Sequence, residues 1–91
     1  MLRIAQTRLF KKQLKQCRKR GWDMAAMNEV VDMLQRREVL PAKHHDHALS
    51  GNRRGQRDCH LKPDWVLIYR IREDVLILQL LETGSHSDLT L

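Results

Sequence analysis

The chain has 91 residues, 42% of them hydrophobic, which predicts a single globular domain over residues 1–91 with a modest core. Seventeen Lys and Arg against eleven Asp and Glu give a formal net charge of +6, so nucleic acid is an expected partner. Aromatic residues make up only 4%, which argues against an aromatic platform for single strands. No apolar run is long enough to cross a membrane and no signal peptide is evident, so we expect a cytoplasmic protein that makes no membrane contact.

The first half of the chain predicts one short strand and two helices. The segment MLRIA, residues 1–5, is short and apolar enough for an edge strand. Thr7 is a predicted cap for a helix that ends at Arg20 before Gly21. Asp23 is a predicted cap for a second helix, and Pro41 closes this helical half. The apolar stripes are Leu9, Phe10, Leu14 and Cys17 in the first helix, and Met24, Met27, Val30, Val31 and Leu34 in the second.

The second half predicts strands after a polar loop over residues 42–54. From Gln56 onward the apolar period is two, with strand candidates at 56–62, 65–72 and 75–83. The short turns between them, Pro63-Asp64 and Glu73-Asp74, require antiparallel hairpins. The predicted fold is therefore α+β, with two N-terminal helices packed on an antiparallel β-meander that has an N-terminal edge strand. Cys17 and Cys59 show no CxxC spacing, and we interpret both as buried free thiols.

The stretch RDCHLKPDW, residues 57–65, gathers polar side chains around one proline. If Cys59 and Leu61 face the core, strand alternation puts Asp58, His60 and Lys62 together on the opposite face. Two further histidines could reach the same region from outside the strand, with three arginines nearby. These residues are His47, His86, Arg53, Arg54 and Arg57.

Histidine accompanied by cations suits RNA cleavage by attack of a ribose 2′-OH on the adjacent phosphate. Histidine can take or give a proton near neutral pH, and arginine stays charged beside the phosphate. This route needs neither a metal nor a cofactor. Ordinary structural roles explain the same residues: His60 as a polar surface residue, Asp64 as a turn residue, and Trp65 as a core anchor.

The segment HHDH, residues 44–47, admits two interpretations. Imidazole and carboxylate groups bind zinc or nickel, although adjacent residues seldom converge on one ion. We expect no metal there, and we assign the His44 and His45 side chains to a solvated loop.

The run DHALSGNRRGQRDCHLKPDWVLIYRI, followed by LLETGSHSDL, resembles the YafQ-type toxins of the RelE/ParE superfamily. The recurring family pattern is DH-x-L-x-G, then G-x-R-x-x-H-x-x-P-D-W-x-L-I-Y, then TG-[ST]-H. The resemblance implies a RelE/ParE-like fold and the toxin of a type II toxin–antitoxin system. Such toxins are ribosome-dependent endoribonucleases that cut mRNA in the A site of the small (30S) subunit and leave a 2′,3′-cyclic phosphate. A cognate antitoxin holds them inactive, and operator DNA would be contacted only indirectly, through that antitoxin.

The resemblance also implies roles for single residues. It makes His47, His60, Asp64 and His86 the catalytic candidates. Trp65 would help to position RNA, and the cationic residues beside the site are candidate RNA contacts: Arg53, Arg54, Arg57 and Lys62. Asp58 matches a family position next to the site. The chain departs from the family at Ala48, where proline is frequent, and at Thr90, where phenylalanine is common and Leu91 is a poor substitute.

Two other functions remain open. A ParE-like toxin shares the fold but inhibits DNA gyrase by binding, without chemistry. A catalytically weak nucleic-acid-binding regulatory module is the second, and Thr90 is its best support. The three histidines favour the nuclease, because gyrase binding does not need them.

Overall fold

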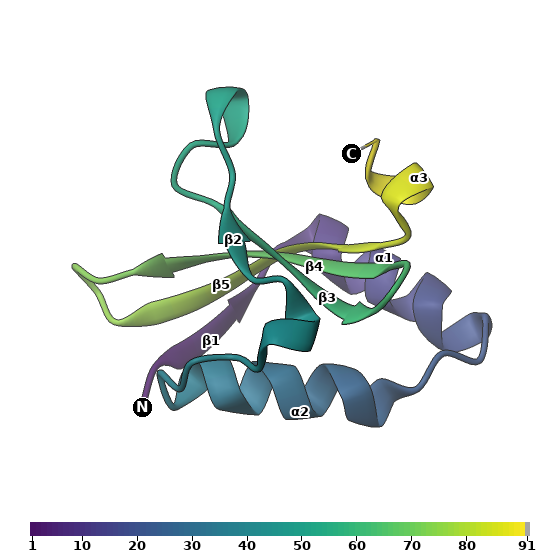
Figure 1. Ribbon diagram of the computed structural model, residues 1–91, viewed down its shortest axis with the longest axis horizontal. Coiled ribbons are helices and arrows are strands. Elements are labelled where there is room, and N and C mark those ends of the chain that lie inside the picture. The colour runs from purple at the N-terminus through teal and green to yellow at the C-terminus, as the bar shows by residue number, and fades with distance from the viewer. Residues whose placement is uncertain (91) are drawn as a thin grey trace.

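The computed structural model describes residues 1–90, which form one five-stranded sheet with helices on both sides (Figure 1). The helices are α1 (Arg8–Lys19), α2 (Met24–Gln35) and α3 (His86–Leu89). The strands are β1 (Arg3–Gln6), β2 (His47–Ala48), β3 (Arg57–Lys62), β4 (Trp65–Arg72) and β5 (Ile77–Gly84). Two short 3₁₀ segments, η1 (Ala42–His44) and η2 (Gly51–Arg53), flank β2.

The strand order in the sheet is β1-β5-β4-β3-β2. Strands β2 to β5 pair antiparallel with their neighbours, whereas β1 runs parallel to β5 and forms one edge. The parallel pairing is possible because α1 and α2 carry the chain between β1 and the meander. The predicted α+β fold with its meander and N-terminal edge strand is therefore confirmed. Residues 42–54 were predicted to be a loop, but this segment contributes β2 to the edge of the sheet opposite β1.

The predicted caps begin both long helices. Thr7 accepts a hydrogen bond from the Phe10 amide at 2.9 Å, and Asp23 accepts one from the Ala25 amide at 3.0 Å. Gly21 has a φ of 79°, as expected for the residue that ends α1. Helix α2 ends at Gln35, well before Pro41, because Arg37 adopts a left-handed φ of 62°.

Apolar side chains pack on both sides of the sheet. The larger core lies between the sheet and the two long helices; it includes Phe10, Cys17, Met27, Val30, Leu34, Cys59, Leu61, Leu67, Tyr69, Leu78 and Leu80. A smaller cluster on the other side holds Val66 and Ile68 under Leu89 of α3. Strand β4 is thus buried on both faces, which explains its continuous apolar run. Both cysteines are buried and free, as predicted, but Leu9 is 48% exposed and lies outside the core.

The β4–β5 turn is longer than the sequence suggests. β5 begins at Ile77 instead of residue 75, because Leu76 takes a left-handed φ of 55° and stays exposed together with Val75. None of the helices formed within residues 1–90 has the length and apolar character needed to cross a membrane.

Candidate active site

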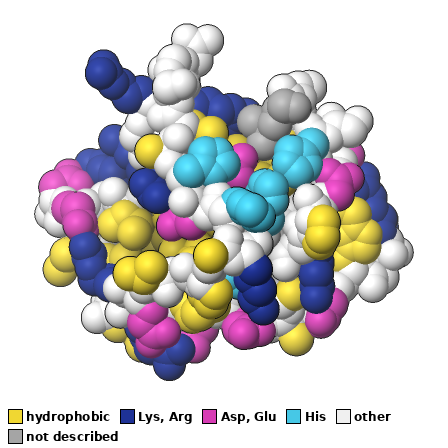
Figure 2. Space-filling model, viewed as in Figure 1, with side chains coloured by type: hydrophobic (Ala, Val, Ile, Leu, Met, Phe, Trp, Pro, Cys, Tyr) yellow, Lys and Arg dark blue, Asp and Glu magenta, His cyan; other side chains and the backbone are white. Residues whose placement is uncertain are grey.

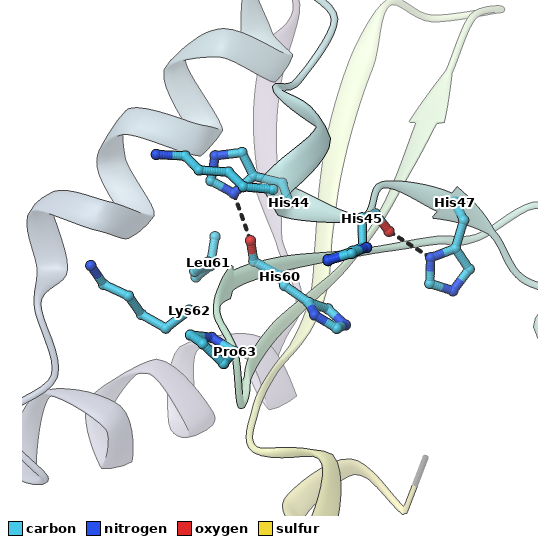
Figure 3. A pocket seen from close by; sticks show the side chains of 8 residues that line it. His44, His45, His47, His60, Leu61, Lys62 and Pro63 are labelled. Atoms are coloured by element: carbon cyan, nitrogen blue, oxygen red, sulfur yellow. Dashed lines mark hydrogen bonds between the residues drawn. The ribbon is translucent and has the colours of Figure 1, made fainter.

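An open pocket of about 810 Å³ lies where β2, β3 and η1 meet. Figure 2 shows histidine side chains gathered on this face of the molecule. The side chains around the pocket come from η1 and the residues after it, and from the end of β3 (Figure 3). They are Lys43, His44, His45, His47, His60, Leu61, Lys62 and Pro63.

The three predicted catalytic histidines come from separate parts of the chain. His47 on β2 lies opposite Asp58 on β3, two residues before His60 on the same strand. His86, at the start of α3, has its ring centroid 5.0 Å from that of His60, with the rings nearly perpendicular. The ring of His45 also lies near His60, with ring centroids 5.4 Å apart. The fold therefore groups His47, His60 and His86 on one surface.

Asp64 in the β3–β4 turn is bound to His86. Its Oδ1 accepts hydrogen bonds from His86 Nδ1 at 2.6 Å and from the His86 amide at 3.1 Å. The bond from the His86 side chain, helped by the bond from the amide, lowers the pKa of Asp64. Asp64 is therefore a carboxylate at neutral pH, and Nε2 is the His86 nitrogen left for proton exchange.

The short helix α3 is held in place by further contacts. Ser85 and Asp88 form a capping box at its start, and Leu89 is buried against the smaller apolar cluster. Arg20, at the end of α1, donates to both Asp88 carboxylate oxygens at 2.6 and 3.1 Å. The Arg20 bond lowers the pKa of Asp88 far below its usual value. His86 thus stands on a segment fixed from two sides.

Asp58 and His60 form a second carboxylate–histidine pair, with a different geometry. Asp58 is 5% exposed, and its Oδ1 has no hydrogen-bond partner within residues 1–90. This oxygen lies 3.7 Å from His60 Nε2, beyond hydrogen-bonding distance. Burial lowers the pKa of His60, and the negative charge of Asp58 opposes this effect. His60 is therefore mainly neutral near pH 7 but has an anion close enough to stabilise an added proton.

His44 does not lie in solvent, and that expectation was wrong. The residue is only 6% exposed, and Nδ1 donates to the backbone carbonyl oxygen of His60 at 2.6 Å (Figure 3). A carbonyl oxygen can only accept, so this bond fixes the tautomer of His44. His45 is exposed, as expected. His47 donates Nδ1 to the carbonyl oxygen of His45 at 2.6 Å, which leaves Nε2 of His47 unprotonated in the neutral ring.

The predicted RNA-contacting cations differ in their surroundings. Lys62 is exposed and lines the pocket, and Arg54 is exposed. Arg53 donates to Glu82 at 2.6 Å and is partly buried. Arg57 donates through Nε to Asp46. A register shift between His60 and Lys62 interrupts the simple alternation that was expected to place them on one face.

Trp65 is a core residue in this structure, which is the alternative that the sequence left open. The residue is 2% exposed, and its ring lies 5.2 Å, centroid to centroid, from the ring of Trp22. The indole Nε1 donates to Thr83 Oγ1 at 2.9 Å. Because burial leaves neither ring face open to a base, any effect of Trp65 on RNA must pass through the backbone that it anchors.

The structure also bears on Thr90 and on the metal alternative. Thr90 is exposed and ends α3 in a left-handed conformation, with φ of 53°. Leu91 lies outside the described residues. Within residues 1–90, no group of three or more His, Cys, Asp or Glu side chains is arranged to hold a metal ion. Sequence reasoning missed Lys43 and the buried role of His44, although the cluster of histidines at 44–47 was a signal for both.

Comparisons with known proteins identify the family of this chain. A sequence model of the family "Bacterial toxin of type II toxin-antitoxin system, YafQ" matches residues 2–91. The mRNA interferase toxin YafQ of Escherichia coli is 36% identical over 81 residues, which cover 88% of this chain and 86% of that protein. A metal-bound toxin from Helicobacter pylori is 40% identical with a TM-score of 0.93, covering 98% of this chain and 99% of that one. YafQ from its complex with DinJ in E. coli is 33% identical with a TM-score of 0.88, covering 98% of both chains. The chain therefore belongs to the YafQ family of bacterial toxins from type II toxin–antitoxin systems.

Proposed function

We propose that this protein is an endoribonuclease that cleaves mRNA in the A site of the ribosome. The observation that carries the proposal is the grouping of His47, His60 and His86 from three separate segments, with His86 bound to Asp64. The mRNA interferase activity named for the E. coli relative supports the substrate class. Lys43 and Lys62 beside the pocket would offset the charge of RNA phosphates.

In the proposed reaction, His60 takes the proton from the ribose 2′-OH. The lowered pKa of His60 keeps its ring neutral and able to accept near pH 7. The buried Asp58 oxygen, 3.7 Å from Nε2, then stabilises the imidazolium. The 2′ oxygen forms a bond to phosphorus, and the bond from phosphorus to the 5′ oxygen breaks. The products are a 2′,3′-cyclic phosphate and a 5′-hydroxyl end.

His86 is the proposed acid for this step. Its Nδ1 bond to Asp64 orients the ring, so that Nε2 of the protonated ring can give a proton to the departing 5′ oxygen. His47, whose Nε2 is a free acceptor in the neutral ring, would accept a hydrogen bond from a ribose hydroxyl and so help to position the RNA. Exchange with water returns both histidines to their starting states.

The proposed chemistry uses side chains only, so we infer that cleavage is independent of metals and cofactors. Neutral and protonated imidazoles supply base and acid, and cationic side chains supply charge near the phosphate. The metal-bound toxin from H. pylori makes this inference worth testing directly, because that protein is 40% identical to this chain.

A cognate antitoxin is the proposed protein partner. E. coli YafQ forms a complex with DinJ, which supports an antitoxin for this chain as well. With a net charge of +6, the toxin should attract an acidic segment that covers the pocket and competes with RNA. Any contact with operator DNA would be made through the antitoxin.

The proposal is tested by expressing the protein without its partner. We expect growth arrest and shortened mRNA, with DNA supercoiling unchanged. Loss of supercoiling with intact mRNA would assign the protein to the ParE-like gyrase inhibitors. Ribosome binding without cleavage would support the catalytically weak module, in which Thr90 replaces the usual aromatic residue.

A further inference from the structure

Asp46, the residue just before β2, is tied to the interior of the sheet. Tyr69 on β4 donates its hydroxyl to Asp46 Oδ1 at 2.6 Å. Arg57 on β3 donates Nε toward the same oxygen at 3.3 Å, and this Nε also lies 3.3 Å from the Tyr69 hydroxyl. We refer to these three side chains as the Asp46 clamp. The reaction described above gives none of them a chemical step.

The clamp is anchored in the rigid part of the molecule. Tyr69 is 1% exposed and belongs to the core under the two long helices, so its hydroxyl requires a partner. Burial, together with the bond to Asp46, raises the pKa of Tyr69, so the hydroxyl remains a donor at every pH at which the protein would work. The bonds to a carboxylate are of the stronger, charge-assisted kind.

The backbone around His47 has little else to hold it. β2 is two residues long, pairs with β3 through only two residue pairs, and has no strand from residues 1–90 on its other side. His45, two residues earlier, adopts a left-handed φ of 47°. Such a short edge strand gains little from its backbone hydrogen bonds, so side-chain anchors decide where it lies.

The clamp also sets the direction of His47. Asp46 contacts Tyr69, whose side chain belongs to the core on the helical side of the sheet. His47 lies opposite Asp58, which shares a strand face with His60, on the other side. Drawing Asp46 to one side therefore directs His47 to the side of the candidate active site.

We propose that Asp46 is a positioning residue, which acts with Tyr69 and Arg57 to keep His47 at the pocket. The inference rests on the proposed nuclease function. It also changes the expected role of Arg57 from a contact with RNA phosphate to a support of the active-site loop.

The first test measures single-turnover cleavage on programmed ribosomes. Asp46→Ala should lower the cleavage rate by about 10- to 100-fold, since a displacement near 1 Å can cost about 100-fold, and Asp46→Asn and Tyr69→Phe should lower it less. In a His47→Gln background, Asp46→Ala should add less than about a twofold loss, because both changes act through one residue. Asp74→Asn, which alters the exposed Arg72–Asp74 pair, is the matched control and should have no effect. Equal losses from Asp46→Ala in both backgrounds would overturn the proposal.

A second readout does not depend on activity. The ¹⁵N chemical shifts of the His47 ring report its tautomer, which the bond from Nδ1 to His45 now fixes. Asp46→Ala and Tyr69→Phe should shift these signals, whereas the control Asp74→Asn should not. If both clamp variants are folded and their His47 signals are unchanged, the positioning role of Asp46 is refuted, even if the protein cuts no RNA. If the Asp46→Ala variant does not fold, the His47 signals of the Tyr69→Phe variant decide whether the clamp positions His47.

The salt dependence of RNA binding separates the two roles of Arg57. Arg57→Gln should leave the slope of log affinity against log salt unchanged if Arg57 only supports the loop. A slope reduced by about one would instead identify a lost phosphate contact and argue against the clamp.

Discussion

Replacement of His60 by glutamine is the sharpest test of the proposed chemistry. Glutamine keeps a similar size and hydrogen-bonding capacity but cannot take up a proton near neutral pH. A general acid or base contributes about 10²- to 10⁴-fold, so the cleavage rate should fall by that factor, or by about 3 to 5 kcal/mol in activation free energy. The assay is single-turnover cleavage on programmed ribosomes, with melting temperature as the check on folding.

The control for this test is His45→Gln. The His45 ring lines the same pocket and lies 5.4 Å from the His60 ring, but it is exposed and no proton-transfer step is assigned to it. The reasoning fails if the His60 and His45 variants, both folded, cleave at equal rates. His44 cannot serve as the control, because its buried ring holds the His60 carbonyl oxygen.

The same substitution should change how stability depends on pH. Since burial lowers the pKa of His60 in the folded state, the unfolded chain binds a proton more readily than the folded one. The wild-type protein should therefore lose stability as pH falls through the unfolded value, about 6.5, toward the folded one. His60→Gln should lose less over this range. A steeper loss in the variant, seen in melting temperatures from pH 7.5 to 5, would contradict the lowered pKa.

Three further predictions address metal independence, the antitoxin and the buried histidine His44. Cleavage should persist after treatment with excess chelator once magnesium is restored for the ribosome; activity rescued by zinc, copper or nickel alone would refute metal independence. Antitoxin binding should weaken as salt rises, and a partner that leaves RNA access open would contradict competition at the pocket. His44→Gln should lower the free energy of unfolding by about 1 to 3 kcal/mol, because it removes a buried hydrogen bond. It should reduce cleavage less than His60→Gln does. A His44→Gln variant that is as stable as the wild type in a denaturant titration would argue against that bond.

The local features of this protein could be read from its sequence because they depend on residues near one another. Thr7 and Asp23 cap their helices through bonds within one turn, and both were identified from residue type and spacing. Cys59 and Leu61 lie in the core, as was assumed when alternation was applied to β3. The family pattern added the catalytic candidates, including two histidines that local periodicity alone could not connect to His60.

Only the tertiary structure decided which side chains are buried and which distant groups meet. His44 and Trp65 look like loop and site residues in the sequence, yet both are buried, because the chain around them packs against β3 and Trp22. In the sequence, Arg20 is only one of many cationic residues. No local pattern predicts that it binds Asp88, 68 residues away. The clamp on Asp46 is likewise invisible until β3 and β4 are paired in register. Such contacts arise from how the sheet and helices pack, and residue spacing does not encode them.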